Sequence, residues 1–194
     1  TAAVINGTNK EVRDKIGMVI RMVMLIAIPS FIAFLVIPKQ ILSLLYIGDI
    51  STPANMLRLG AITVVFYCLS TITNSILQGL NKMSRPVVHG AISVAIHLFA
   101  IFIMLVVFKW GIYSLVLGNV VFSLSMCILN AKSIKKATGY RQELKKTYII
   151  PLSAAAIMGV LILVLWYSFA IVMPGKLATI LTVATGGLTY GILL

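Results

Sequence analysis

The chain has 194 residues, of which 60% are hydrophobic and only 10% are charged. Soluble domains are usually about 45–50% apolar and about 25% charged, so this composition excludes an ordinary water-soluble domain. The net charge of +12 does not indicate nucleic-acid binding, because the basic residues stand mainly in short gaps between apolar runs. Cys68 and Cys127 lie inside apolar runs and predict free, packed thiols rather than a disulfide framework.

Six apolar runs have about the length that a membrane span requires. A bilayer core about 30 Å thick is crossed by roughly 20 apolar residues of helix. The runs are Ile16–Ile37, Met56–Leu80, Val87–Phe108, Ile112–Leu129, Ile149–Met173 and Leu177–Leu194. Because backbone groups cannot stay unpaired in lipid, we expect each run to be a helix. The predicted fold is an all-α, polytopic transmembrane helix bundle with six spans in this segment.

Basic residues are concentrated in alternate gaps between the runs, which predicts the orientation. Eleven of the 16 Lys and Arg residues lie before the first run, between the second and third, or between the fourth and fifth: Lys10, Arg13, Lys15, Lys82, Arg85, Lys132, Lys135, Lys136, Arg141, Lys145 and Lys146. The other gaps hold only Lys39, Lys109 and Lys176. The positive-inside rule therefore places the first set of gaps, and the N-terminus, in the cytoplasm.

Three segments lie outside the spans. Residues 1–15 form a polar, cytoplasmic lead-in that starts without Met, which predicts that the chain is part of a longer protein. Residues 39–55 alternate apolar and polar side chains too briefly to span, and predict an outer-face interfacial turn that carries Asp49. The basic segment 130–148 is expected to be a cytoplasmic loop with a short amphipathic helix broken near Gly139. Its six cations set the topology or also hold anionic lipid headgroups.

The acidic residues argue against catalysis within this segment. There are only four, Glu11, Asp14, Asp49 and Glu143, and none lies inside a run. A membrane-embedded hydrolase, glycosyltransferase or proton pump generally needs carboxylates at membrane depth. No metal cluster, nucleophile–base set or phosphate-binding glycine loop appears in the sequence. We therefore expect no catalytic residue, no metal and no cofactor, which leaves a transport or scaffold role.

Two arginines and one proline inside the runs are candidates for a role in transport. Arg21 and Arg58 lie near the ends of their runs, so each can extend its guanidinium to the membrane interface. The alternative is that either arginine faces a wet cavity and binds a phosphate or pyrophosphate. Pro29 removes a backbone hydrogen bond in the first run and predicts a kink, which is either static or a hinge for alternating access.

Four further polar residues inside the spans have two interpretations each. Asn74 and Gln78 are four residues apart and share one face of the second helix. His97 lies near the middle of the third run, and Asn119 lies in the fourth. Each of them either makes hydrogen bonds within the helix bundle or lines a substrate cavity. In the last run, Gly187 and Gly191 have a small-xxx-small spacing that indicates close helix packing.

Four sequence motifs resemble one family of membrane exporters. The segment IRMVMLIAIPSFIAFLVIPKQILSLLYIGD (20–49) resembles a pattern in which a proline-bearing helix precedes a "P-x-x-I-L-x-L-L-Y" turn. ILQGLNKMSRPVV (76–88) resembles an "L-Q-G-L-x-K … P" loop. PLSAAAIMGVLILVLWY (151–167) and GGLTYGILL (186–194) resemble the last two helices of the same proteins. The family is the MOP exporter superfamily, in its polysaccharide biosynthesis or stage V sporulation protein B-like branch, which is related to the lipid II flippase MurJ.

The resemblance implies a flippase of fourteen helices, two six-helix lobes with an extra pair at the C-terminus. Residues 16–129 would then be four helices of the second lobe, and 149–194 the extra pair. Family members move polyprenyl-pyrophosphate-linked saccharides across the bacterial cytoplasmic membrane by alternating access, and in relatives of MurJ the extra pair forms a groove for the lipid tail. By this resemblance the groove contains small residues: Gly159, Gly186, Gly187 and Gly191.

The sequence therefore predicts the C-terminal part of a bacterial flippase for lipid-linked cell-envelope precursors. Its expected partners are the lipid-linked saccharide, the membrane lipids and the remaining N-terminal helices of the same protein, but no nucleic acid. One alternative is a cation-coupled multidrug exporter of the MATE type, which the extra helix pair and the missing intramembrane carboxylate disfavour. Another is a membrane scaffold for envelope synthesis that transports nothing.

Overall fold

The computed structural model describes residues 9–194, so most of the predicted lead-in 1–15 lies outside the described residues. Between residues 9 and 194 the chain forms helices, and six of them are long and apolar enough to cross a membrane. This confirms the predicted all-α, six-span bundle. The elements in chain order are α2 (Asn9–Val36), α3 (Pro38–Leu45), α4 (Ser51–Gly79), α5 (Ser84–Val106), α6 (Tyr113–Thr138), a π-helical turn η1 (Lys145–Ile149), α7 (Ile150–Val172) and α8 (Gly175–Leu193).

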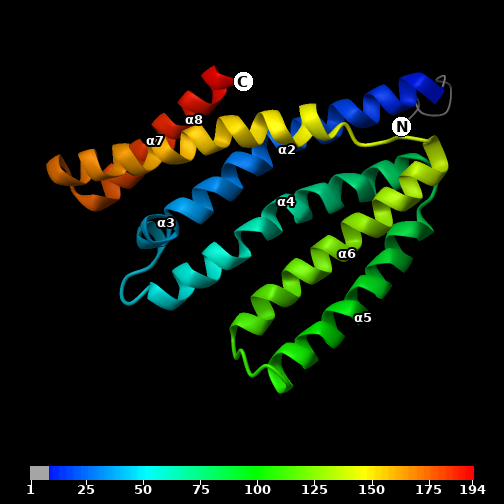
Figure 1. Cartoon of the computed structure of the whole chain (residues 1–194), viewed down its shortest axis with the longest axis horizontal. Coiled ribbons are helices and arrows are strands. Elements are labelled where there is room, and N and C mark those ends of the chain that lie inside the picture. The colour runs from blue at the N-terminus through cyan, green and yellow to red at the C-terminus, as the bar shows by residue number, and fades with distance from the viewer. Residues whose placement is uncertain (1–8) are drawn as a thin grey trace.

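Helix α2 is the centre of the arrangement. It lies between α4 on one side and α7 on the other, with α6 packed on α4 and α5, and α8 packed on α7 (Figure 1). The side chains of Ile20, Met24, Ala27 and Ile28 on α2 are almost completely buried. Their spacing places them on one face of a helix, which is the face that a partner helix covers. Helix α2 therefore connects a three-helix group, α4 to α6, with the α7–α8 pair.

The turn between α4 and α5 shows why the chain interrupts its apolar runs there. Asn81 has a φ of 60°, a left-handed conformation that asparagine tolerates better than most residues. The reversal lets the Lys82 amide donate to the Leu77 carbonyl at 2.9 Å, which satisfies one of the orphan acceptors at the end of α4. Pro86 falls in the first turn of α5, where an amide hydrogen has no helical partner.

Residues 39–55, predicted as an interfacial turn, contain most of the short helix α3, a loop over residues 46–50 and the first residues of α4. Helix α3 begins at Pro38, which suits the first helical position because its missing amide hydrogen is not needed there. It contacts α4 and α8. Its residues Ile41 and Leu44 line an apolar cavity, so α3 contributes to the packing of the bundle.

The basic segment 130–148 is divided between two elements. Residues 130–138 continue α6 instead of forming a separate helix, and α6 ends at Gly139, where the predicted break occurs and φ is 70°. The Arg13 Nε of α2 donates to the Thr138 carbonyl at 2.9 Å. This bond satisfies a carbonyl that the end of α6 leaves open.

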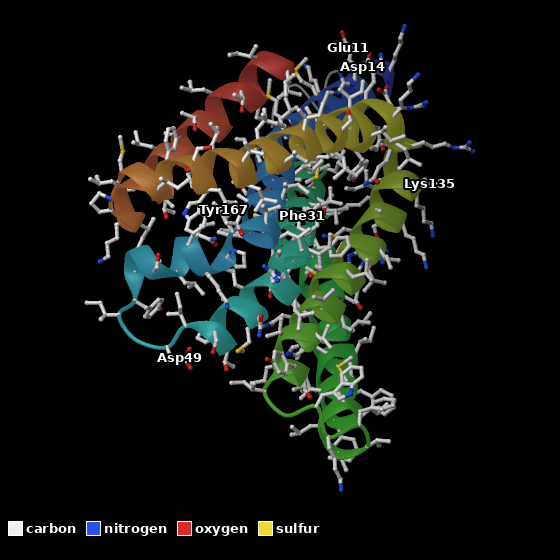
Figure 2. The ribbon with its side chains drawn as sticks, turned by 60° about the vertical axis from the view of Figure 1, so that its left-hand side comes forward. Glu11, Asp14, Phe31, Asp49, Lys135 and Tyr167 are labelled. Atoms are coloured by element: carbon white, nitrogen blue, oxygen red, sulfur yellow. The ribbon has the colours of Figure 1, made fainter. Side chains whose placement is uncertain are left out.

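Most of the basic residues lie at one end of the bundle, here called the basic end, which comprises the start of α2 and the turns 80–83 and 139–144. Figure 2 shows Glu11, Asp14 and Lys135 near this end, whereas Asp49 lies far away in the connection between α3 and α4. Gaps that the charge pattern assigned to one side of the membrane therefore meet at one end of the fold. The assignment of that end to the cytoplasm rests on the positive-inside rule.

Candidate functional site

An apolar groove runs along α2, between it and the C-terminal helix pair. It consists of two adjoining cavities of about 400 and 510 Å³ that share Ser30, Ala33 and Val183. We call it the α2–α8 groove. The first cavity is lined by Leu25, Ile26, Pro29, Ser30, Ala33, Met158, Ile162, Val183, Gly187 and Tyr190. The second is lined by Ser30, Ala33, Phe34, Ile41, Leu44, Ile180, Val183 and Ala184.

Two of the four predicted groove glycines bring helices into contact instead of lining the groove. A Cβ atom at Gly159 would come within 2.7 Å of Ile32 Cγ2, so this glycine lets α7 approach α2. A Cβ atom at Gly186 would come within 2.6 Å of Ile162 Cγ1, so Gly186 lets α8 approach α7. Both distances are shorter than real side-chain contacts, and at both positions the neighbouring side chain already fills the space.

The other two glycines face open space. Apart from the adjoining residues and backbone of α8, no atom of residues 9–194 lies within 4 Å of a Cβ built on Gly187 or on Gly191. Gly187 is on the wall of the first cavity, whereas Gly191, one turn further along α8, lies outside both cavity walls. Of the four glycines, only Gly187 therefore keeps the groove wide directly.

Pro29 lines the same groove, and α2 remains helical through it. The next residue, Ser30, donates its hydroxyl to the Ile26 carbonyl at 2.8 Å, so this polar group on the groove wall is satisfied within its own helix. The other polar group of the wall is the Tyr190 hydroxyl, which is buried without a hydrogen-bond partner among residues 9–194. The remaining lining residues are apolar, so most of the wall is hydrocarbon. A hinge at Pro29 stays a prediction.

Arg21 lies at the basic end, where its guanidinium meets a carboxylate. Its Nη2 donates to Glu143 Oε2 at 3.0 Å, and the two side chains are 40% and 55% exposed. The pair connects α2 with the turn that precedes η1. The Nε of Arg21 is buried without a hydrogen-bond partner among residues 9–194.

Arg58 lies at the other end of the bundle and is exposed. Its Nε donates to the Leu35 carbonyl at 3.1 Å. Leu35 belongs to the last turn of α2, where backbone carbonyls lack helical partners. Arg58 thus closes the end of α2, and it lies far along the bundle from Arg21.

Asn74 belongs to a buried polar cluster that sequence reasoning did not find. Asn130 of α6, which is fully buried, donates its amide to Asn74 Oδ1 at 2.8 Å and to Thr73 Oγ1 at 3.0 Å. The Oδ1 of Asn130 is 2.8 Å from Nδ1 of His89 on α5. The His89 Nε2 is in turn 3.1 Å from the Ser133 hydroxyl. These side chains connect three helices near the basic end.

Gln78 does not join the cluster. It is exposed, one turn beyond Asn74 on α4, and its side chain makes no hydrogen bond within residues 9–194. The sequence carried a partial signal for the cluster, because Asn130 and Ser133 are three residues apart and so lie on one helix face. The signal from α5 was weaker, since His89 directly follows an apolar pair and a proline.

His97 and Asn119 occupy different environments. The His97 ring packs edge-on against Phe122 with centroids 5.9 Å apart, and its Nδ1 is buried without a partner in the described chain. A Cβ atom on Gly118 would lie 2.5 Å from Ile101 Cγ1 and 3.1 Å from His97 Cε1, so this glycine makes room mainly for Ile101 and also for the edge of the ring. Asn119, the next residue, is exposed. The structure therefore does not bring the six predicted polar site residues into one cavity.

The fold and the groove define a multi-pass α-helical membrane protein with an apolar groove beside its C-terminal helix pair. A family model described as lipid II flippase MurJ matches residues 2–185. Since this match covers nearly the whole sequence, the chain belongs to the lipid II flippase MurJ family, whose members are flippases of a lipid-linked precursor. No curated protein and no solved structure matches the chain.

Proposed function

We propose that the chain is the C-terminal part of a flippase that moves polyprenyl-pyrophosphate-linked saccharide precursors across the bacterial cytoplasmic membrane by alternating access. The family match supports a lipid-linked substrate. The observation that carries the proposal is the α2–α8 groove, because its lining residues are almost all apolar and it lies beside the C-terminal pair. The polyprenyl tail would lie in this groove.

The groove would select the tail by shape rather than by hydrophobicity. A polyprenyl chain in the bilayer is already surrounded by hydrocarbon, so moving it onto an apolar wall removes little surface from water. The main favourable contribution to binding the tail is therefore van der Waals contact, which depends on how closely the shape of the groove matches that of the tail. The open wall at Gly187 and the side chains of Phe34 and Leu44 set that shape.

The charged headgroup needs a different environment from the tail. A pyrophosphate is costly to place in hydrocarbon, so its route must be lined by cations and hydrogen-bond donors or filled with water. The two intramembrane arginines of this chain lie at opposite ends of the bundle and already bind Glu143 and the Leu35 carbonyl. In this proposal the remaining N-terminal helices of the same protein complete the headgroup route.

The test narrows the groove without disturbing the helix packing. In the full-length protein, Gly187→Trp fills the first cavity, and Gly191→Trp places the same side chain one turn away, outside the groove. Overpacking typically costs about 1–3 kcal/mol. If that cost falls on bound substrate, transport decreases by roughly 5- to 150-fold in Gly187→Trp, whereas Gly191→Trp stays near wild type.

The measurement is the amount of lipid-linked precursor on the outer face of cells depleted of their own flippase and supplied with each variant. Equal transport by both variants at equal protein levels would contradict the tail groove. Normal appearance of lipid II on the outer face after depletion of the whole protein would argue against a peptidoglycan substrate. In that case another polyprenyl-linked saccharide should accumulate inside.

A further inference from the structure

A second pair of cavities lies between α4 and α6 at the basic end, on a surface that shares no lining residue with the α2–α8 groove. Each cavity has a volume of about 280 Å³, and Ala131 and Gln142 belong to both walls. The cavity nearer the basic end is lined by Ile20, Thr73, Ala131, Lys132, Ile134, Lys135, Tyr140, Arg141 and Gln142. The other is lined by Val65, Phe66, Leu69, Leu124, Cys127, Ile128, Ala131, Gln142, Leu144 and Tyr148.

The first cavity is cationic. Lys132 and Lys135 are three residues apart on α6, so they stand on one helix face, and Arg141 joins them from the following turn. No acidic residue lines either cavity within residues 9–194. The nearest carboxylate in the sequence, Glu143, is held by Arg21 at 3.0 Å. The positive charge of this cavity is therefore not neutralised by its own walls.

The wall of the first cavity also holds an unsatisfied buried group. Tyr140 is only 8% exposed, and its hydroxyl, which lies against Gly17 of α2, has no hydrogen-bond partner in the described chain. Burial and, to a smaller extent, the nearby Glu143 raise the pKa of this hydroxyl, so it stays protonated. The Tyr148 hydroxyl donates to Gln142 Oε1 at 3.2 Å and fixes Gln142 at the junction of the two cavities.

The second cavity is apolar and extends away from the basic end. Along α6 its wall passes from Ala131 to Leu124, a rise of about 10 Å toward the middle of the membrane. Phe66 and Leu69 of α4 form the opposite wall, and Leu144 comes from the turn before η1. A cationic cavity that adjoins an apolar one has the polarity of a phospholipid, with a phosphate at one end and an acyl chain at the other.

We propose that these two cavities bind one anionic glycerophospholipid of the leaflet at the basic end. The phosphate lies among Lys132, Lys135 and Arg141, and one acyl chain lies between α4 and α6 in the second cavity. Basic pockets between transmembrane helices at the cytoplasmic surface are a recognised way of holding anionic headgroups. A guanidinium fork also suits a phosphate better than a single ammonium does. The proposal stands independently of the tail groove.

The first experiment compares two triple variants of the full-length protein by native mass spectrometry. The probes are phosphatidylglycerol and phosphatidylcholine with identical acyl chains. The variant Lys132→Gln/Lys135→Gln/Arg141→Gln removes the cavity charges, whereas Lys136→Gln/Lys145→Gln/Lys146→Gln removes three exposed charges that line neither cavity. Because each basic residue near the surface contributes about 1 kcal/mol, the first variant should lose phosphatidylglycerol affinity by more than about tenfold. The control should lose less than about twofold, because its three exposed charges stand outside both cavities, where salt screens them.

The second experiment separates a lipid from a soluble phosphate. Ala131→Trp fills the junction of the two cavities and should weaken phosphatidylglycerol binding as strongly as the loss of the three cavity charges. Glycerol 3-phosphate, which carries a headgroup without a chain, should not displace the bound lipid. Displacement would overturn the proposal in favour of a soluble-anion site. Equal losses in the two triple variants would overturn it in favour of general surface charge, and unchanged binding in both would exclude the site. The glutamine variants change exposed side chains, so they test the proposal even if Ala131→Trp fails to fold.

Discussion

Arg21 of α2 and Glu143 of the turn before η1 form an ion pair at 3.0 Å, although 122 residues separate them in the sequence. Glu143 is one of only four acidic residues in the chain. For its partner, Arg21, the sequence alone allowed either a position at the membrane interface or a role in binding substrate. The pair holds the start of the C-terminal helix pair against α2. It is partly exposed, so its contribution to stability is modest.

The ion pair predicts a charge-reversal rescue. Arg21→Glu and Glu143→Arg should each lower the thermal stability of the protein, because each places like charges side by side, and the double variant should recover most of the loss. For an exposed pair the coupling free energy is expected to be about 0.2–1 kcal/mol. Thermal unfolding in detergent measures it. Should the double variant regain stability but not transport, Arg21 would also contact the substrate.

The buried polar cluster predicts that substitution of one asparagine on α6 lowers the stability of the protein and that substitution of another does not. Asn130→Ala removes the amide that joins Asn74, Thr73 and His89, and leaves Nδ1 of the buried His89 without its partner. An unsatisfied buried group costs about 1–3 kcal/mol, so this variant should unfold at a clearly lower temperature. Asn119→Ala is the matched control because Asn119 is exposed, and its effect should stay within about 0.5 kcal/mol. Similar losses in both variants would contradict the structural role of the cluster.

Neighbouring glycines on α8 should respond in opposite directions to the same substitution. Gly186→Ala pushes a methyl group into Ile162, and overpacking of this kind costs about 1–3 kcal/mol. Gly187→Ala meets open space, and alanine favours a helix over glycine by up to about 1 kcal/mol. Thermal unfolding should therefore show a loss of stability for the first variant and a small gain for the second. A stable Gly186→Ala variant would mean that α8 does not depend on this close approach to α7.

The glycine that ends α6 predicts that its substitution changes amide exchange only in the turn that follows. Gly139 has a φ of 70°, a conformation that costs a residue with a Cβ atom about 1–2 kcal/mol. Gly139→Ala should loosen the turn 139–144 and make its amides exchange faster with solvent, while the amides in the middle of α6 remain protected. Gly79→Ala, in a helical position with open space around it, is the control and should leave exchange unchanged. Uniform acceleration along the whole of α6 would instead point to global destabilisation.

Much of the fold could be predicted from the sequence because lipid imposes a simple rule. An apolar run that crosses a bilayer must pair its own backbone, so length and hydropathy alone indicated the six spans. The prediction was weaker where that rule does not apply. Residues 130–138 are polar enough to look like a loop, yet they continue α6 until Gly139 ends it. Residues 38–45 are too short to span, yet they form α3 against neighbouring helices.

The candidate site was less predictable, because side-chain partners lie far apart in the sequence. His89 and Asn130 are 41 residues apart, and no pattern in the residues around His89 indicates which residue it contacts. The spacing of Gly186 and Gly187 likewise gave no reason to separate them. On a helix, adjacent residues point about 100° apart, so one packs against α7 and the other faces the groove.

The sequence by itself determined the number of spans and the distribution of charge, since these depend only on local composition and on the cost of exposing a backbone to lipid. Only the tertiary structure decided which polar groups are satisfied and which surfaces stay open. It brought Arg21 next to Glu143 and placed Gly187 on a groove wall. Helices that meet inside a bilayer remove little apolar surface from water, so the hydrophobic effect does not decide which of their faces come together. Their arrangement follows instead from close packing and hydrogen bonds between distant residues.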